Sequence, residues 1–383
     1  MTFATTPQAK QKNWLERFTD QPHQLFFISA VLFSIFSMTM SIASFLGLEV
    51  NFNIYHGYGL IFAVFTNAFL GFLFTVIPKY TNAKPIKSSE YIAIWVFYQI
   101  VLVTLFLGME TIGLVGLSFV LLLAVASLFK TIKSGNALYK KESYILVSLL
   151  LSSSIILSIE VIFSITLMSV LFWGYLLGMV FVVALKMVPA FYSAYTQIKP
   201  WVKPKYIYEV SILILFSIGV SEQFDLIMMK KIVSFIGLLF FLYIIFSLKI
   251  YKRTPAILYV LTSSFLWFAI GIIVYFIESF FELYTMKLSF HILAIGFILN
   301  LLIGFGSRVA MGHAVPSQRI EADKITIFLF LFTQVVVISR ILSSVFYVYN
   351  YSFFMDLFLI SSLLWIALFI VWSLRYGKTL LRV

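Results

Sequence analysis

Twelve long apolar runs, each bounded by charged residues or by glycine and proline, dominate this chain of 383 residues. A helix needs about 20 apolar residues to cross a bilayer. The runs are continuous rather than alternating, which argues against the strands of a transmembrane barrel. We therefore predict an all-α, polytopic membrane protein with about twelve transmembrane helices. The expected spans are 24–47, 57–78, 91–109, 112–129, 144–164, 167–188, 206–220, 232–248, 256–277, 288–307, 325–346 and 353–374, the seventh being the shortest.

Composition excludes several other classes of protein. Charged residues make up 11% of the chain, against about 25% in soluble domains, so neither a soluble globular protein nor a disordered chain is expected. Cysteine is absent. Disulfides, iron–sulfur clusters, thiolate metal sites and covalently attached c-type haem are therefore excluded.

The distribution of the net charge of +12 indicates orientation in a membrane rather than binding to a nucleic acid. Basic residues gather in alternate loops and at both termini, as cytoplasmic segments of membrane proteins do. We expect both termini in the cytoplasm, with a leader at 1–23, one transmembrane domain at 24–374 and a tail at 375–383. The first run is too long for a cleaved signal peptide, and the short loops leave any chemistry to the helices. The basic residues outside this pattern are Lys230, Lys231, Lys287 and Arg340.

The polar groups at mid-span are neutral amides, namely Asn67, Gln99, Asn300 and Gln334. Such groups usually form hydrogen bonds between helices. Ion-coupled transporters generally place a carboxylate or an unwound helix near the midplane, and neither feature is evident in the sequence.

Two of the four histidines are expected at one depth. His56 opens the second span and His291 lies near the start of the tenth, and both spans run from outside to inside. Two imidazoles at one level on separate helices suit an axial pair for haem iron or half of a copper site. The alternative is two unrelated interfacial histidines. His23, at the end of the polar leader, is interpreted as an interfacial residue.

Small residues follow His56 at helical spacing, at Gly59 and Ala63, with Asn67 one turn further. A stripe of this kind permits close packing of helices. It equally permits a planar macrocycle to approach, and the sequence leaves both interpretations open.

Basic side chains mark the inner end of the same spans. Arg308 lies 17 residues beyond His291, about 25 Å along a helix. Lys79, Lys186 and Arg308 are predicted at one level, where they would hold an anion or haem propionates. Ordinary positive flanking residues are the alternative.

His313 also lies at this inner end, two residues beyond Met311. It is either a metal ligand beside that methionine or a simple loop histidine. If the tenth span stays helical, His313 and His291 are too far apart to bind one metal.

Three segments resemble the NnrS family. They are 55–81 in the second span, 186–191 after the sixth, and 291–313, which carries the most distinctive motif. The resemblance implies a bacterial inner-membrane protein with twelve spans, associated with nitric oxide and containing haem and copper. It implies His56, His291 and His313 as cofactor ligands, with Arg308 near the site.

The chain departs from the family pattern at three positions. Tyr58 and Gly59 stand where relatives commonly carry a second histidine and an acidic residue, and Lys186 replaces an arginine and its bidentate fork. Fewer metals are therefore expected, with haem favoured over copper. Without cysteine, the haem would be b-type.

The function implied is a haem membrane protein of the nitric oxide response. Catalysis, sensing and protection stay open, and so do the redox partner and any catalytic residue. The partners expected are the lipid bilayer and nitric oxide or a related small molecule. The alternatives are a twelve-helix small-molecule transporter and an assembly factor for a respiratory complex.

Overall fold

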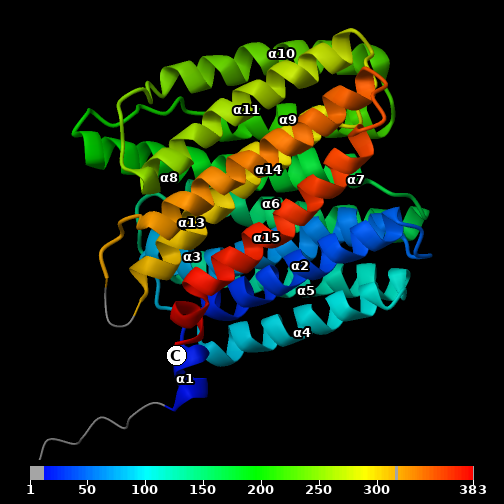
Figure 1. The fold of residues 1–383 in the computed structure, drawn as a ribbon. Helices are drawn as coiled ribbons and strands as arrows, with labels where there is room; N and C mark the ends of the chain where they lie inside the picture. Colours follow the sequence, from blue (N-terminus) through cyan, green and yellow to red (C-terminus); the bar gives the residue numbers. More distant parts are fainter. Residues whose placement is uncertain (1–12, 315–317, 383) are drawn as a thin grey trace, which may run out of the picture.

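The computed structural model describes residues 13–314 and 318–382, and every regular element within these ranges is a helix (Figure 1). Eleven helices in this part of the chain are long and apolar enough to cross a membrane. The prediction of a polytopic helical membrane protein is confirmed. The single-helix spans are α2 (Pro22–Phe45), α4 (Ser88–Phe106), α5 (Glu110–Ser134), α6 (Lys141–Phe163), α10 (Ile227–Ser247), α11 (Ala256–Phe280), α14 (Lys324–Val348) and α15 (Phe354–Leu381).

Three further spans are composite, because each contains a stretch of wider π-helix. They are Asn53–Thr81, Met168–Thr196 and Leu288–Gly312, and they are the most buried of the eleven spans. The bilayer excludes unpaired backbone groups, so each span stays hydrogen-bonded throughout as one continuous helix. Their parts are η1 (Asn53–Thr66) and α3 (Asn67–Thr81); α7 (Met168–Val170), η2 (Leu171–Leu177) and α8 (Gly178–Thr196); and α12 (Leu288–His291), η3 (Ile292–Leu299) and α13 (Asn300–Gly312).

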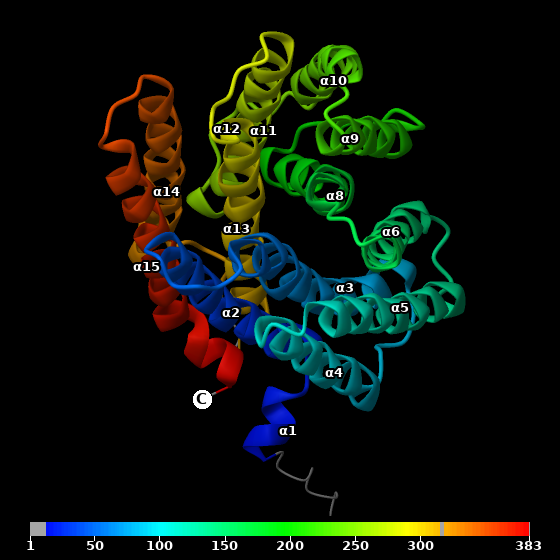
Figure 2. The same ribbon diagram turned by 90° about the vertical axis from the view of Figure 1, so that its right-hand side faces the viewer.

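The predicted seventh span corresponds to α9 (Ile207–Gln223), which has 17 residues. This is slightly shorter than the length of about 20 residues that spans the hydrocarbon core. Figure 2 shows α9 beside α8 and α10, in the place that the predicted order of spans gives it. The described residues therefore contain eleven helices of membrane-spanning length, and a shorter helix, α9, lies in the place of the predicted seventh span.

Both described ends of the chain meet at one end of the bundle (Figure 1). The indole of Trp14, on the short helix α1 (Trp14–Phe18), donates a hydrogen bond to the carbonyl of Leu381 at 2.9 Å. The side-chain amide of Gln24 donates to the carbonyl of Leu380, also at 2.9 Å. An even number of spans places the two ends on one side in this way. That this side is cytoplasmic stays a prediction from the charges.

The mid-span amides join neighbouring helices, as predicted. Gln334 on α14 donates to the side-chain oxygen of Asn300 at 3.0 Å and accepts from the indole of Trp267 on α11 at 2.7 Å. Asn67 and Gln99 face each other at 3.4 Å. These bonds fix the lateral register of helices whose outer faces are apolar.

Candidate functional site

His56 and His291 lie together at the end of the bundle opposite the termini. Their ring centroids are 6.3 Å apart and their planes are inclined at 38°. His56 belongs to η1, and His291 is the last residue of α12. The expectation that these two residues share a depth therefore matches their placement.

Nδ1 of His291 forms a hydrogen bond, and Nε2 is left to act as a ligand. Its Nδ1 lies 2.8 Å from the carbonyl oxygen of Lys287. A carbonyl only accepts, so Nδ1 carries the hydrogen and the lone pair is left on Nε2. This is the usual way in which proteins orient a metal-binding imidazole.

His56 is held by packing rather than by a hydrogen bond. Its ring stacks on Phe52 with 4.8 Å between centroids and 19° between planes. Its Nδ1 is buried without a hydrogen-bond partner. Buried polar atoms are nearly always paired, with protein groups or with ordered water, and this nitrogen has no partner among the protein atoms.

Both histidines line a cavity of about 360 Å³. We call it the imidazole cavity. Wide helical turns often occur at functional sites, and all three π-helical stretches contribute to its wall. Gly57 allows Met168 to pack beside the pair, since a Cβ there would lie 2.7 Å from the methionine methyl carbon. The other lining residues are Met38, Asn53, Leu60, Ile61, Phe65, Ser169, Phe172, Leu176, Lys287, Phe290, Ala294, Ile295 and Trp365.

Arg340 on α14 is a buried cation that the sequence analysis did not select. It is 5% exposed, and it donates to the hydroxyl of Ser344 at 2.6 Å and to the carbonyl of Met286 at 3.3 Å. Its Nε is buried without a partner, and no carboxylate pairs with it among the described residues. Met286 precedes Lys287, whose carbonyl holds His291, so Arg340 braces the loop that positions this imidazole. The signal available in the sequence was a lone arginine within an apolar run.

The predicted stripe of small residues serves helix packing. A Cβ on Gly59 would lie 2.8 Å from the hydroxyl of Ser37 on α2. Asn67, further along the stripe, shares a hydrogen bond with Ser29 on the same helix. Of the two interpretations left open by the sequence, the structure supports close contact between helices over a slot for a macrocycle.

A second pair of imidazoles lies at the end of the bundle near the termini. His313, which caps α13, has its ring centroid 4.6 Å from that of His23 on α2. The Lys79 ammonium donates to Nε2 of His313 at 3.3 Å, while Nδ1 of His313 lies 3.1 Å from the carbonyl of Val309. Burial, joined by the positive charges of Lys79 and Arg382, lowers the pKa of His313. A neutral imidazole is therefore expected there.

His23 is buried inside the bundle rather than exposed, and its position at the membrane interface stays a prediction. His23 is 1% exposed, and its Nδ1 lies 3.5 Å from the hydroxyl of Thr75. The helix begins two residues earlier, at Pro22, than the apolar run suggested. That extra length draws the imidazole into the bundle.

The two imidazole pairs are far apart. His291 lies near the start of the helical span Leu288–Gly312, and His313 follows its last residue, 22 positions beyond His291, which corresponds to about 33 Å. One metal therefore cannot contact both. Among the residues that the structure describes, no group of three or more histidine, aspartate or glutamate side chains is arranged to hold a metal.

The three basic residues predicted to form an anion site each have a different partner. Lys79 contacts His313. Lys186 lies 3.6 Å from a carboxylate oxygen of Glu142, and the Arg308 guanidinium lies over Phe191, 4.3 Å from the ring centroid. Within the described ranges these contacts give each cation a separate partner, and the joint anion site stays a prediction.

A model of one protein family, described as NnrS protein, matches residues 17–383, nearly the whole chain. A search of curated proteins finds no match.

Proposed function

Because the chain belongs to the NnrS family, we propose that it is a haem membrane protein of the nitric oxide response, with the haem held between His56 and His291. The supporting observation is the separation of 6.3 Å between the two ring centroids. A metal–nitrogen bond of about 2 Å on each side, added to the ring radii, spans about 6 Å. The two imidazoles would hold one metal ion at a separation of this size.

The number of donors favours haem over a bare copper ion at this pair. Two imidazoles complete the coordination of an iron whose macrocycle already supplies four nitrogens. Copper alone would need further donors, and the thioethers of Met38 and Met168 are the soft groups in the same cavity wall. The cavity is mostly apolar and lies within the size range of cofactor sites. Since the chain has no cysteine, the haem would be b-type.

Arg340 is the proposed partner for a carboxylate of the haem. A buried guanidinium without a counter-ion is costly, and its unpartnered Nε leaves a donor for an anion. Lys79, Lys186 and Arg308 cannot serve a haem at this pair, since Arg308 lies about 25 Å along the helix from His291. The inner-end cations therefore lose the propionate role that the sequence suggested.

The residues of the cavity supply binding and orientation. Lys287 fixes the tautomer of His291, and aromatic and aliphatic side chains make most of the wall apolar. Haem would supply the chemistry at this site, because haem iron binds small diatomic gases. Nitric oxide is apolar and enters a site of this kind from the bilayer.

His313 is proposed as a ligand of a second metal, copper in the family pattern, at the inner end. His23 stands beside it as a second imidazole. We place the protein in the bacterial inner membrane by the same family argument.

The absorption spectrum of the protein, purified in mild detergent after expression with ample haem, tests the proposal. A Soret band is expected, and it should be lost or shifted in both His56→Ala and His291→Ala. His23→Ala, which alters an imidazole at the opposite end of the bundle, is the control and should leave the band in place. A protein without a Soret band would overturn the proposal in favour of transport or assembly.

A further inference from the structure

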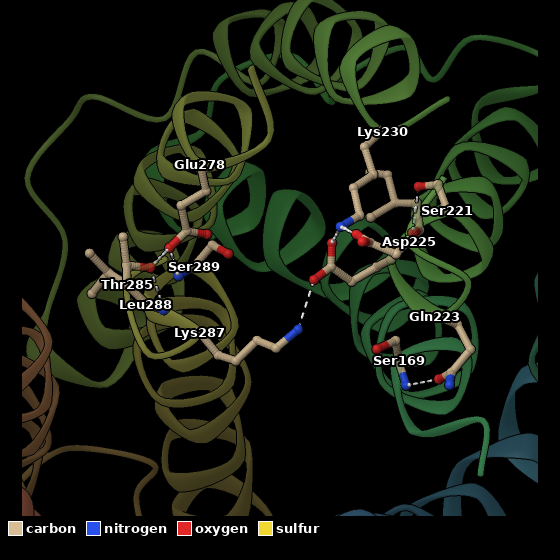
Figure 3. A network of polar contacts seen from close by, with 12 residues as sticks. Ser169, Ser221, Gln223, Asp225, Lys230, Glu278, Thr285, Lys287, Leu288 and Ser289 are labelled. Atoms are coloured by element: carbon tan, nitrogen blue, oxygen red, sulfur yellow. Dashed lines mark hydrogen bonds and ion pairs between the residues drawn. The ribbon is translucent and has the colours of Figure 1, made fainter. Parts of the chain in front are cut away.

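A second cavity of about 360 Å³ opens beside the imidazole cavity at the same end of the bundle. We call it the polar vestibule. Figure 3 shows some of its polar side chains, with Lys287 reaching toward the cluster around Lys230 and Asp225. Other lining residues are Glu222, Ile227, Tyr275, Glu278, Ser279, Glu282, Leu283, Tyr284, Thr285 and Phe290.

The polar vestibule and the imidazole cavity share part of one wall. Lys287 and Phe290 line both spaces. The Lys287 ammonium lies 5.0 Å from the centroid of the Phe290 ring, and that ring stacks on Phe172 at 4.8 Å. Two side chains therefore separate a charged, water-accessible space from the apolar space around the histidines.

Three of the four carboxylates of the vestibule are neutralised by lysines. Glu222 lies 2.8 Å from the Lys287 ammonium and 3.4 Å from that of Lys230. Asp225 also pairs with Lys230, at 2.5 Å. Glu282 pairs with Lys231 at 2.6 Å.

Glu278 differs from these three, because it has no basic partner among the described residues. Its carboxylate accepts from the hydroxyl of Thr285 and from the backbone N–H of Ser289, the latter at 3.3 Å. The charged and titratable groups around it on the packed elements are Glu222 of α9, Tyr275 and Glu282 of the α11 region, and Lys287. A carboxylate paired only with neutral donors is free to gain or lose a proton without breaking an ion pair.

Two buried hydroxyl groups near Glu278 make no hydrogen bond of regular geometry, although Tyr275 lies near Ser221 and Ser279, and Ser289 lies near the Glu278 carboxylate. Tyr275 is 2% exposed and lines the vestibule, and its hydroxyl has no hydrogen-bond partner. The hydroxyl of Ser289 is likewise buried and unpaired. Buried polar atoms of this kind are satisfied by water when the space is large enough.

The backbone at the shared wall is strained. Met286 and Lys287 both adopt left-handed conformations, with φ of 53° and 57°. Such conformations cost about 1–3 kcal/mol each in residues other than glycine, and they collect at sites that gate or position ligands. Lys287 thus joins three features at one residue: the vestibule carboxylates, the shared wall, and the carbonyl that orients His291.

We propose that the polar vestibule is the aqueous entrance to the imidazole cavity, with Glu278 as its proton-exchanging carboxylate and with Lys287 and Phe290 as the partition. Water at the outer surface gives a proton to the Glu278 carboxylate. Movement of the partition lets that proton pass to water in the imidazole cavity, which returns Glu278 to its charged form. The use made of the proton rests on the proposed function, whereas the route itself does not.

Glu160 is the competing carboxylate at this end of the bundle. It accepts from the hydroxyl of Tyr58 at 3.1 Å and from the backbone N–H of Leu167. It lines neither cavity. Its bonds tie α6 to η1, which is a structural role.

Cysteine accessibility tests the route without requiring haem, because the natural chain contains no cysteine. Leu283→Cys reports on the vestibule and Ala294→Cys on the imidazole cavity. A charged, membrane-impermeant methanethiosulfonate reagent is added from the outer side of sealed membranes. The vestibule cysteine should react quickly, and the cavity cysteine slowly.

The partition is then opened by Phe290→Ala. The reaction rate at Ala294→Cys should rise about tenfold or more, in proportion to the population of the open state. Phe281→Ala, which removes an exposed ring outside both linings, is the matched control and should not change that rate. If Ala294→Cys reacts equally slowly with Phe290→Ala and with Phe281→Ala, the proposal that the vestibule is the entrance is contradicted.

The role of Glu278 is tested on the haem-loaded protein in sealed vesicles by a sudden change of outer pH. The haem absorption should respond, and Glu278→Gln should slow that response about tenfold or more if it carries the proton. Glu282→Gln, whose partner lies outside the vestibule lining, should respond at the normal rate. The role of Glu278 would be contradicted if the haem absorption responded at equal rates in the two variants. It would also be contradicted if the absorption did not change with outer pH. Failure to load haem would overturn the proposed function and leave the cysteine result to decide the entrance.

Discussion

The rings of His56 and His291 face each other across 6.3 Å although 235 positions separate them in the chain. Each ring sits at or beside a π-helical stretch. A π-helix turns less per residue than an α-helix, which changes the direction in which the side chains point. The π-helical stretches in the two spans thus orient the two imidazoles in a way that regular α-helices would not.

Removal of either imidazole is expected to weaken haem binding strongly. Changes to groups that merely orient a ligand already cost about 10–100-fold in affinity, so His291→Ala should cost at least that much. Titration of the haem-free protein with haem, followed by absorption, measures the effect. An affinity unchanged in both His56→Ala and His291→Ala would place the haem elsewhere.

Gln334 should stabilise the bundle through Asn300 and Trp267. Hydrogen bonds between membrane helices contribute about 0.6 kcal/mol on average and up to about 1.7 kcal/mol. Gln334→Leu should lower the free energy of unfolding toward the upper value, since it leaves two partners unpaired. Thermal unfolding in detergent measures it, with Thr39→Val on the exposed face of α2 as the control. Equal effects of the two substitutions would contradict the prediction.

The order of the helices and the outer imidazole pair were within reach of the sequence. Long apolar runs predict which segments cross the membrane, and the charges of alternate loops predict the direction of each span. Together they place His56 and His291 at one depth. The contact between His23 and His313 was not predictable in this way, because it depends on where α2 begins and on how the chain turns after α13. The sequence predicts one membrane depth for Lys79, Lys186 and Arg308. A shared depth does not determine the direction in which each side chain leaves its helix.

Asp323 should stabilise the start of α14 in a pH-dependent way. Its side chain accepts from the backbone N–H of Thr326 at 2.8 Å and from Arg375 on α15 at 2.9 Å. Partial burial acts to raise its pKa, but these hydrogen bonds and the Arg375 charge outweigh burial, so the pKa of Asp323 is lowered. Because the folded pKa lies below the unfolded value of about 3.9, the charge contributes stability above that pH. The contribution is lost as pH falls through the folded pKa.

Two substitutions separate the cap of α14 from its charge. Asp323→Ala should cost about 1 kcal/mol as a lost helix cap, whereas Asp323→Asn keeps a capping oxygen and should cost less. The difference between the natural protein and Asp323→Asn should vanish in acid. Thermal unfolding at neutral and acidic pH measures both effects, and a difference that grows in acid would contradict the sign.

Arg340 should have opposite effects on the empty and haem-loaded protein. Without an anion, its buried charge lacks a counter-ion among the described residues, and replacing such a charge by an apolar side chain is often neutral or stabilising by about 1–4 kcal/mol. Arg340→Met should therefore raise or maintain the melting temperature of the haem-free protein. With haem bound, the lost charged hydrogen bond should cost about 1.5–3 kcal/mol, which weakens haem binding about 10–100-fold. Arg340→Lys keeps the charge but not the planar fork, so an intermediate affinity is expected. Melting curves with and without haem, together with haem titrations, measure both signs. A variant that destabilises the two forms equally would assign Arg340 to bracing the Met286 loop alone.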